Sequence, residues 1–440
     1  MNIDDDYLKE KPGALETGIK GALANGRITI NLGGYRTHVT ESEIKKNKCH
    51  TVQVASCAKI SIVRPINRKG CQTPTGRIAM KAAVLRQLGR LDIEDVQLDG
   101  PRAEELRIRV LASGLCHSDY HVVTGDLPTA LPAVLGHEAA GVVEAVGSAV
   151  TGFAPGDMVI TCLSSFCGHC YPCQGGHNHR CEDKPGDPTD RDAGSRITAS
   201  NGEAIYQLGN LGGFAEEMVV HQSSAVKMPE GLPASCAALL GCGVLTGTGA
   251  VLNAARVEPG STVAVIGCGG VGLNAVQGAR IAGAARIIAI DTNADKFDLA
   301  RKFGATDVVQ AGPDTVAEVI EMTRGGVDYA FEVVGTAATA QNAYDMVRAG
   351  GTAVLVGVAP LNSSLSVPIT GMIISEKRVI GTLMGSTPFQ TYLPKLAALY
   401  LQGSLLLDDL VSEEIPLDRI NEGYAQMIGG NIARSVITFN

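Results

Sequence analysis

The chain of 440 residues contains no tryptophan, and aromatic residues make up only 4% of it. Aromatic side chains are the surfaces on which single-stranded nucleic acid stacks, so this composition argues against such a ligand. The formal net charge of −8 also argues against a polyanionic partner. We therefore expect no nucleic-acid partner.

The sequence also lacks long apolar runs. No uninterrupted stretch of about 18 apolar residues is present, and no apolar segment follows a basic N-terminus. We expect neither a membrane partner nor a secretion signal. In such a chain the twelve cysteines are better explained as metal ligands and free thiols than as disulfides, which indicates a reducing, cytoplasmic location.

The composition changes along the chain and predicts an α/β protein in four parts. Residues 1–79 hold 13 Lys and Arg against 7 Asp and Glu, with weak periodicity only at RITINL and TVQVAS, and we expect a poorly ordered extension without a catalytic role. Short alternating or apolar runs separated by Gly and Pro predict a β-rich catalytic domain over 80–243. Apolar strands alternating with helical stretches over 244–386 predict a doubly wound parallel sheet. Residues 387–440 end in the strand-like SVITF, and we expect them to return to the catalytic domain.

Two candidate zinc donors lie in the stretch GLCHSDYHVVTGDLPTALPAVLGHE, namely Cys116 and His137. A thiolate and a neutral imidazole are preferred zinc ligands, and Cys242 in GCGVLTG offers a third. Three protein ligands leave one tetrahedral position open, as in catalytic zinc sites. Taken singly, each residue could be a buried small side chain or a core histidine. Together with the motifs below, they are interpreted as metal ligands.

A glycine-rich turn follows the apolar run STVAVI. It consists of Gly267, Cys268, Gly269, Gly270, Val271 and Gly272. The turn opens a helical stretch, and Asp291 ends the next predicted strand, which completes the dinucleotide-binding pattern. Glycines there let the backbone approach a diphosphate at the helix N-terminus. Asp291 would bind the adenosine ribose hydroxyls and repel a 2′-phosphate, which favours NAD over NADP, and Lys296 could contact the same ribose.

Four further cysteines lie close together in FCGHCYPCQGGHNHRC. They are Cys167, Cys170, Cys173 and Cys181. Four thiolates at this spacing predict a closed structural zinc site in a lobe over 163–185. An iron–sulfur cluster would use a similar run, but the long last gap and the lack of a second set favour zinc. His169, His177 and His179 are interpreted as surface residues of this lobe.

From Met80 to Asn440 the chain resembles the zinc-dependent medium-chain alcohol dehydrogenases. The resemblance rests on GHE at 136–138, the four-cysteine lobe, GCGVLTG and VIGCGGVGLNAVQG with Asp291. Its wording is most similar to the branch that includes class III-like, aryl-alcohol and nitrosoaniline-dependent enzymes. The resemblance implies a GroES-like catalytic domain, a Rossmann cofactor domain, and a homodimer or homotetramer.

The resemblance also assigns roles around the catalytic metal. It implies zinc ligation by Cys116, His137 and Cys242, with Glu138 behind the metal. Asp119 would hydrogen-bond the free ring nitrogen of His137. Ser118 would contact the alcohol oxygen, and His121 would pass the proton to solvent.

Two groups of assignments concern the cofactor and the substrate. The family often has an arginine aimed at the cofactor diphosphate where this chain has His117. Arg434 matches a second diphosphate-binding arginine and would carry more of that interaction. Leu163, Val358 and Leu127 match positions that line the substrate pocket, which predicts an apolar alcohol tail.

These observations predict a reversible, NAD-dependent oxidation of an alcohol to an aldehyde or ketone, by hydride transfer from a zinc-bound alkoxide. We expect one catalytic and one structural zinc per subunit. The alternatives on the same scaffold are an S-(hydroxymethyl)glutathione (formaldehyde) dehydrogenase and a polyol dehydrogenase. A non-catalytic protein that binds NAD or zinc is a further alternative, against which the intact set of site residues argues.

Overall fold

The computed structural model describes residues 2–3, 27–32, 35–40, 51–54, 58–61, 76–185, 195–430 and 432–439. The chain divides into two compact units, Met1–Gln72 and Thr73–Asn440. The strands described in the first unit are β1 (Asn2–Ile3), β2 (Arg27–Leu32), β3 (Tyr35–Thr40), β4 (Thr51–Val54) and β5 (Ala58–Ser61). Strands β1 to β3 form one sheet, and β4 pairs with β5. Most of 1–79 lies outside the described residues, so the expectation for this segment stays a prediction.

The second unit begins with a hairpin that the alternating pattern predicts, β6 (Ile78–Gln87) and β7 (Arg90–Leu98). The hairpin closes a barrel with β9 (Ala133–Val134), β12 (Ile197–Ala199) and β13 (Ala204–Gln207). A neighbouring sheet is built on β8 (Glu105–Gly114), β10 (Ala139–Val146), β11 (Met158–Thr161), β14 (Glu217–His221) and β15 (Ala225–Lys227). These strands confirm the β-rich character of this region.

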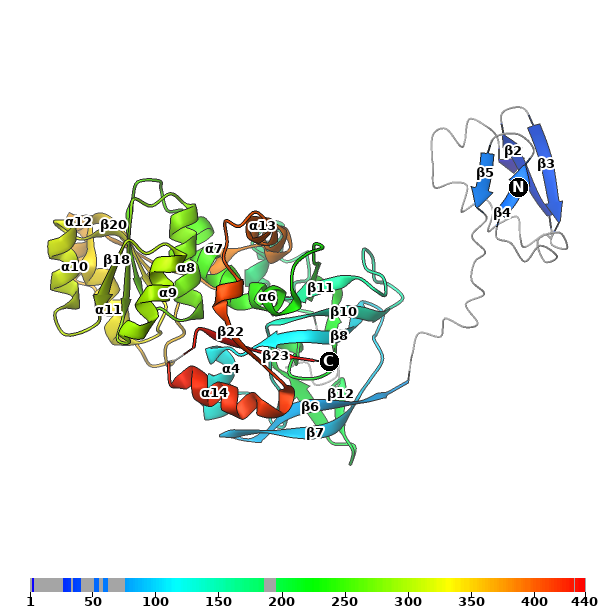
Figure 1. The fold of residues 1–440 in the computed structure, drawn as a ribbon, viewed down its shortest axis with the longest axis horizontal. Coiled ribbons are helices and arrows are strands. Elements are labelled where there is room, and N and C mark those ends of the chain that lie inside the picture. Colours follow the sequence, from blue (N-terminus) through cyan, green and yellow to red (C-terminus); the bar gives the residue numbers. More distant parts are fainter. Residues whose placement is uncertain are drawn as a thin grey trace. The chain divides into compact units, whose positions relative to one another are not determined.

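The C-terminal segment returns to this sheet, as the sequence predicts. Strands β22 (Val411–Ile415) and β23 (Arg434–Thr438) extend it, and β23 runs antiparallel to β8. Figure 1 shows them in red, with α14 (Ile420–Ile428), beside the cyan strand β8 and the blue barrel strands β6 and β7. Residues near both ends of this unit therefore build one domain.

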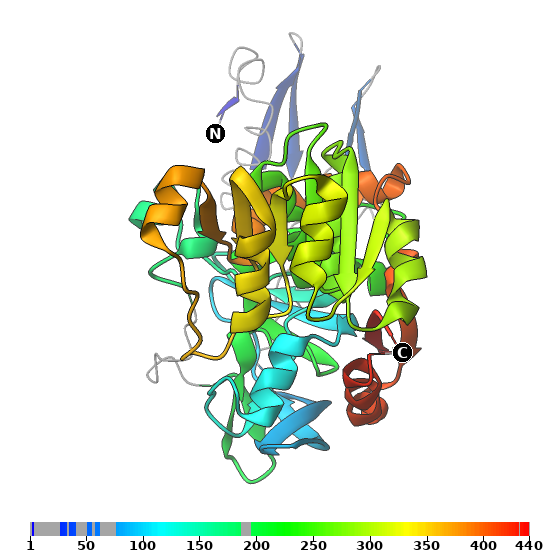
Figure 2. The ribbon, with the colours of Figure 1, turned by 90° about the vertical axis from the view of Figure 1, so that its left-hand side faces the viewer.

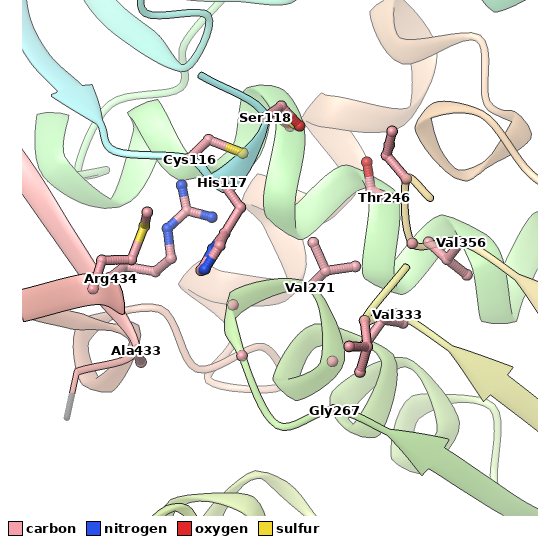
Figure 3. A pocket seen from close by; sticks show the side chains of 18 of the residues that line it. Cys116, His117, Ser118, Thr246, Gly267, Val271, Val333, Val356, Ala433 and Arg434 are labelled. Atoms are coloured by element: carbon pink, nitrogen blue, oxygen red, sulfur yellow. The ribbon is translucent and has the colours of Figure 1, made fainter. Parts of the chain in front are cut away.

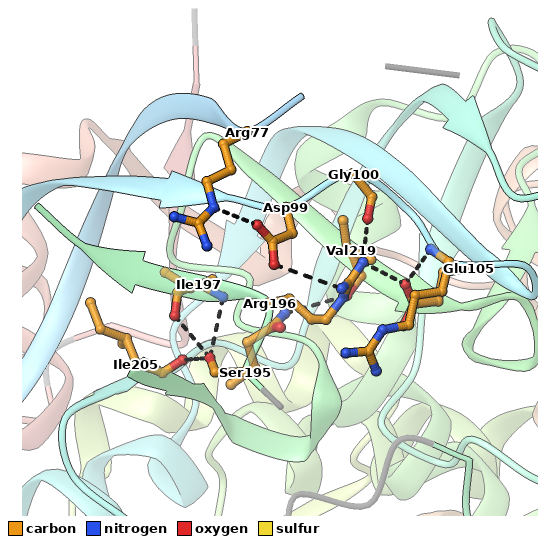
Figure 4. A network of polar contacts seen from close by, with 11 residues as sticks. Arg77, Asp99, Gly100, Glu105, Ser195, Arg196, Ile197, Ile205 and Val219 are labelled. Atoms are coloured by element: carbon orange, nitrogen blue, oxygen red, sulfur yellow. Dashed lines mark hydrogen bonds and ion pairs between the residues drawn. The ribbon is translucent and has the colours of Figure 1, made fainter. Parts of the chain in front are cut away.

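A network of ion pairs and hydrogen bonds connects the barrel to the start of β8 (Figure 4). The Arg196 guanidinium lies 2.8 Å from Oε2 of Glu105 and 3.9 Å from Oδ2 of Asp99, which in turn pairs with Arg77 at 2.9 Å. Burial lowers the pKa of Arg196, while the Glu105 carboxylate opposes that shift. The paired charges fix the connection between β7 and β8.

The predicted doubly wound sheet contains six parallel strands. They are β16 (Thr262–Ile266), β17 (Arg286–Asp291), β18 (Asp307–Gln310), β19 (Val327–Glu332), β20 (Val347–Leu355) and β21 (Arg378–Gly381). Their order is β18-β17-β16-β19-β20-β21, so the order reverses between β16 and β19. Ligands of such sheets bind beyond the carboxyl ends of the strands at this reversal.

Helices cover both faces of the parallel sheet (Figures 1 and 2). One face carries α8 (Gly270–Ile281) and α9 (Phe297–Phe303), and the other carries α10 (Thr315–Thr323) and α11 (Ala337–Met346). The short helix α12 (Ile369–Ser375) precedes the edge strand β21.

A nearly continuous helical segment over 234–255 joins the two domains, and we did not predict it. It comprises α6 (Ala234–Leu239), η5 (Leu240–Val244), α7 (Leu245–Gly249) and η6 (Ala250–Ala255), of which η5 and η6 are π-helical. By length and composition alone this segment could cross a membrane, but 83% of its most apolar stretch is buried inside the fold. Packing within the core therefore accounts for its apolar character. It also crosses position 243, where we expected a domain boundary.

Candidate active site

The three predicted catalytic zinc ligands converge from distant parts of the chain. Cys116 precedes α4 (His117–Thr124), His137 lies between β9 and β10, and Cys242 lies in η5. Their ligand atoms and a carboxylate oxygen of Glu138 all lie within 4.8 Å of one another, and all four residues are buried. The arrangement has the donor set of a zinc site.

The orientation of His137 fits a metal. Its Nδ1 atom lies 3.0 Å from Oδ2 of Asp119, whose Oδ1 accepts a hydrogen bond from the Gly136 N–H at 3.0 Å. Its Nε2 atom is buried and has no hydrogen-bond partner. A buried nitrogen without a partner is costly unless it ligates a metal, and the Asp119 contact fixes the tautomer that leaves Nε2 free.

The two thiols of this cluster are coupled, and their pKa values shift in opposite directions. A hydrogen bond from the Cys242 thiol lowers the pKa of Cys116, and the same hydrogen bond raises the pKa of Cys242. A thiolate is the form that binds zinc. The cluster therefore favours the ligand form of Cys116 before any metal is added.

Glu138 and Arg434 form a buried ion pair behind the ligands. Arg434 Nη2 donates to Oε2 of Glu138, and Oε1 accepts from the Gly243 N–H at 3.2 Å. Burial raises the pKa of Glu138, and the Arg434 charge opposes that shift. A Cβ at Gly114 would lie 2.4 Å from Oε2 of Glu138, and one at Gly243 only 2.6 Å from Nη1 of Arg434. Glycine at both positions therefore makes room for the pair.

A cavity of about 540 Å³ joins this cluster to the glycine-rich turn. Its wall includes Cys116, His137 and Cys242 at one end and Asp291 at the other. Figure 3 shows His117 and Arg434 between the cysteine and the turn. Arg434 lines the cavity as predicted, but one of its guanidinium nitrogens is committed to Glu138.

The predicted proton-relay residues, Ser118 and His121, both line the cavity from α4. His121 Nδ1 lies 3.2 Å from Oδ2 of Asp126, an exposed carboxylate that also accepts a hydrogen bond from Thr124 at 2.7 Å. The Thr124 and His121 contacts lower the pKa of Asp126. His121 thus connects the cavity to an acceptor in solvent, although the relay itself stays a prediction.

The glycine-rich turn has the shape that a diphosphate requires. Gly267 has φ of +105°, and a Cβ at Gly272 would lie 1.8 Å from the Gly267 carbonyl oxygen. Nothing lies within 4 Å of the Cβ position of Gly269, which lines the cavity with Gly270 and Val271. The turn leads into α8, so its amides can meet an anion at the helix N-terminus.

Asp291 ends β17 and is buried beside this turn. Its Oδ2 accepts a hydrogen bond from the Cys268 N–H at 2.7 Å, and Lys296 Nζ lies 3.2 Å away. Asp291 therefore ends a strand beside the turn, as predicted, while ribose binding by Asp291 and Lys296 stays a prediction. The carboxylate and the ammonium both face the cavity.

The apolar wall of the cavity is only partly predicted by sequence. Leu163 and Val358 line it as expected, whereas Leu127 packs against the barrel core instead. Six further residues that line the cavity were not predicted from the sequence, namely Thr246, Val333, Val334, Val356, Leu383 and Met384. The three valines directly follow β19 and β20. The carboxyl ends of the predicted strands could therefore have identified them as cavity residues.

The four-cysteine lobe also forms a compact donor set. Ligand atoms of Cys167, Cys170, Cys173 and Cys181 lie within 4.8 Å of one another. The amides of His169 and Cys170 donate to the Cys167 sulfur at 3.5 and 3.3 Å. The Glu182 amide lowers the pKa of Cys170 to about 6. Backbone donors around four clustered sulfurs fit a zinc tetrathiolate.

One expectation for the lobe is wrong. His169 and His177 are exposed as predicted, but His179 is only 2% exposed. Burial lowers the pKa of His179 to about 4. It is a core residue of the lobe, because the 3-10 turn over Asn178–Arg180 directs it inward.

Residues 102–230 match the alcohol dehydrogenase GroES-like domain, and residues 270–399 match the zinc-binding dehydrogenase domain. An alcohol dehydrogenase zinc-binding domain protein from Burkholderia ambifaria is 36% identical, with a TM-score of 0.79, over 83% of this chain and 100% of that one. Benzyl alcohol dehydrogenase from Acinetobacter calcoaceticus is 30% identical, with a TM-score of 0.76, over 82% and 100%. A zinc-binding dehydrogenase from Sinorhizobium meliloti bound to NADP is 28% identical, with a TM-score of 0.69, over 82% and 100%.

Proposed function

Because this chain belongs to the zinc-dependent medium-chain alcohol dehydrogenase family, we propose that it interconverts an alcohol and an aldehyde or ketone with NAD and two zinc ions. The observation that carries the proposal is a single cavity that contains the Cys116, His137 and Cys242 cluster and the glycine-rich turn. An alcohol at the first and a dinucleotide along the second would meet inside it.

Each part of the site has a separate task. Bound zinc would act as a Lewis acid on the alcohol oxygen, and bound NAD would accept the hydride. Asp119 holds His137 in the ligand tautomer. Ser118 would accept a hydrogen bond from the alcohol, and His121 would carry the proton toward Asp126 and solvent.

The direct test is metal content combined with cofactor reduction. We expect about two zinc ions per subunit and formation of NADH with a simple alcohol. A purified protein with two zincs that binds NADH yet reduces no NAD with any alcohol would support the non-catalytic alternative. The nine cysteines that the structure describes are all free, so expression in a reducing cytoplasm should give protein suitable for these measurements.

The choice of NAD over NADP rests on Asp291. A carboxylate at the end of β17 would face the adenosine ribose and repel a 2′-phosphate. Lys296 offsets part of this charge, and the relative from Sinorhizobium meliloti is bound to NADP, so the fold alone does not decide between the two cofactors. Asp291→Gly should therefore relax the preference, measured as kcat/KM for both cofactors. A wild-type protein that prefers NADP would contradict the assignment.

The cavity wall favours an alcohol with an apolar tail. Leu163, Val358 and Met384 line it near the metal cluster. A panel of benzyl alcohol, aliphatic primary and secondary alcohols, sorbitol and S-(hydroxymethyl)glutathione separates the alternatives. We expect the highest kcat/KM with the apolar alcohols and the lowest with the polyol and the glutathione adduct.

We also propose that the chain forms a homo-oligomer through α12 and β21. Ile369, Ile373 and Ile374 on α12 are at least 70% exposed, and β21 is an edge strand of the sheet. A two-fold axis would let two β21 strands pair while these side chains become buried. Ile373→Glu should lower the mass measured by light scattering, with Glu318→Gln as the control.

A further inference from the structure

Glu332 is a buried acid that none of the roles above uses. It ends β19 and is only 2% exposed. In the sheet register it stands between Ile266 of β16 and Leu355 of β20. It therefore lies at the carboxyl edge of the sheet, next to the reversal of strand order, on the side opposite Asp291.

Its carboxylate organises the loop between β19 and α11. Oε1 accepts hydrogen bonds from the amides of Val334 and Gly335, at 2.8 and 2.7 Å, and from the Thr339 hydroxyl at 2.8 Å. The two amides can only donate, so this oxygen is the acceptor that holds the loop. The Glu332 main-chain oxygen also accepts from the amides of Val356 and Gly357, at 2.8 and 3.0 Å, in the loop after β20.

The two loops that Glu332 holds are part of the cavity. Val333 and Val334 line it from the first loop, Thr339 lines it from the first turn of α11, and Val356 and Val358 line it from the second loop. The loops pack tightly, since a Cβ at Gly357 would lie 2.2 Å from the Gly335 nitrogen. Val334 also packs against the glycine-rich turn, since a Cβ at Gly267 would lie 2.9 Å from the Cγ2 atom of Val334. Glu332 thus sets the shape of one wall.

The strand order indicates which half of the cofactor this wall receives. Asp291 and β17 lie on one side of β16 and would hold the adenosine half. The loops after β19 and β20 lie on the other side of β16, where the nicotinamide half would lie, in the same cavity as the metal cluster. This step rests on the proposed function.

The charge of Glu332 is not balanced by the protein. Within the part of the chain that the structure describes, no Lys, Arg or His forms an ion pair with it. An ionised carboxylate taken out of water is costly, and hydrogen bonds from amides and a hydroxyl offset only part of that cost. A cation that arrives beside it would be stabilised, and the oxidised nicotinamide ring is a cation whereas the reduced ring is neutral.

We propose that Glu332 is a positioning residue of the nicotinamide half of the cofactor site and that its buried charge favours NAD over NADH. The positioning effect acts through the loops that it holds and the preference for NAD acts through the field of its charge, and neither needs direct contact with the reacting atoms. The ratio of the two dissociation constants is therefore the informative measurement, since a purely structural defect would weaken both cofactors alike.

The central experiment replaces Glu332 with Gln, which keeps an acceptor oxygen and removes the charge. NADH affinity is measured by fluorescence titration and NAD affinity by displacement of NADH. We expect Glu332→Gln to weaken NAD relative to NADH by roughly tenfold, the scale of one charge–charge interaction within a protein. Glu318→Gln, which removes an exposed charge from α10 of the same domain, should leave the ratio unchanged.

A second variant separates hydrogen bonding from charge and tests the positioning role even if Glu332→Gln does not fold. Thr339→Val removes one donor but keeps the carboxylate. We expect weaker binding of both cofactors with no shift of the ratio toward NADH. A shift toward NADH in Thr339→Val, or binding of both cofactors at wild-type strength, would overturn the proposal.

Failure of the proposed function would look different. A wild-type protein that binds neither NAD nor NADH removes both the function and this inference. A wild-type protein that binds both, with an unchanged ratio in Glu332→Gln, overturns only the role of Glu332.

Discussion

The two cysteine clusters of this protein are built in opposite ways. The lobe takes four sulfur ligands from residues 167–181, one loop stiffened by its own backbone amides. The other cluster takes Cys116, His137 and Cys242 from three segments that meet only in the folded domain. The first has four thiols and no open position, and the second has three ligands facing a cavity.

This difference separates stability from catalysis. A local cluster can use its metal to hold a loop that has little core of its own, because metal binding contributes folding free energy. An assembled cluster depends on the packing of the whole domain, including the buried Glu138–Arg434 pair, whose members are 296 positions apart. The same substitution should therefore have different consequences in the two clusters.

The largest effect is expected for Cys116→Ser. Loss of a ligand at the open cluster should lower turnover by at least about 10³-fold, because the Lewis acid is lost or misplaced. Zinc content should fall from two to one, while the melting temperature changes little. Metal analysis, steady-state rates and thermal unfolding measure these three quantities. Turnover near the wild-type value would show that Cys116 does not hold the catalytic metal.

Cys170→Ser is the matched change in the lobe. It should also remove one zinc, but the main result should be a lower melting temperature, with turnover reduced only as the lobe loosens. Thermal unfolding of the two serine variants under identical conditions gives the comparison. If Cys116→Ser unfolds at the lower temperature, the contrast between local and assembled clusters is wrong.

A pair of glycine substitutions extends the contrast from ligands to backbone. A Cβ at Gly243 would lie 2.6 Å from Nη1 of Arg434, whereas the nearest atoms at Gly175 in the lobe lie 3.5 Å away. Gly243→Ala should lower the free energy of unfolding by about 1–3 kcal/mol, as overpacking does, and reduce turnover. Gly175→Ala should stay within about 0.5 kcal/mol of wild type. Urea denaturation followed by circular dichroism tests both, and equal losses would contradict the comparison.

The same distinction explains which elements the sequence could predict. The β6–β7 hairpin, the strands of the parallel sheet and the glycine-rich turn follow from patterns within short windows. The helical segment over 234–255 does not follow from such a pattern. Each glycine inside a helix lowers its stability by about 1 kcal/mol relative to alanine, so a glycine-rich stretch does not predict a helix. Its glycines serve packing instead. A Cβ at Gly241 would lie 2.2 Å from the Thr161 oxygen, and one at Gly247 would lie 2.3 Å from the Val271 oxygen.

The site divides in the same way. Family motifs identify Cys116, His137 and Asp291, since each stands in a characteristic run of residues. Side chains whose role depends on distant partners, such as Glu332 and the walls of the cavity, carry no such signal. The inward direction of His179 likewise depends on how the lobe turns, so its burial could not be read from a polar, glycine-rich sequence.

The smallest effect, and the sharpest comparison, is expected for His117→Arg against His169→Arg. Each position is next to a cysteine ligand, but His117 lines the cavity beside the glycine-rich turn, whereas His169 is exposed in the lobe, 3.3 Å from Asp183. Burial and the Arg434 charge lower the pKa of His117, so at pH 8 the imidazole is neutral and an arginine adds a full positive charge.

At pH 8, His117→Arg should tighten NADH binding by on the order of 1 kcal/mol, or severalfold in Kd, as expected for one charge-assisted hydrogen bond to the diphosphate. Repulsion from Arg434 should not cancel this gain, because Glu138 already pairs with that guanidinium. If release of NADH limits turnover, kcat with alcohol should fall as binding tightens. His169→Arg adds the same charge to the surface lobe and should leave the Kd unchanged. Fluorescence titration of NADH measures both, and an equal change in the two variants would mean that overall charge, and not the position of His117 beside the turn, controls cofactor affinity.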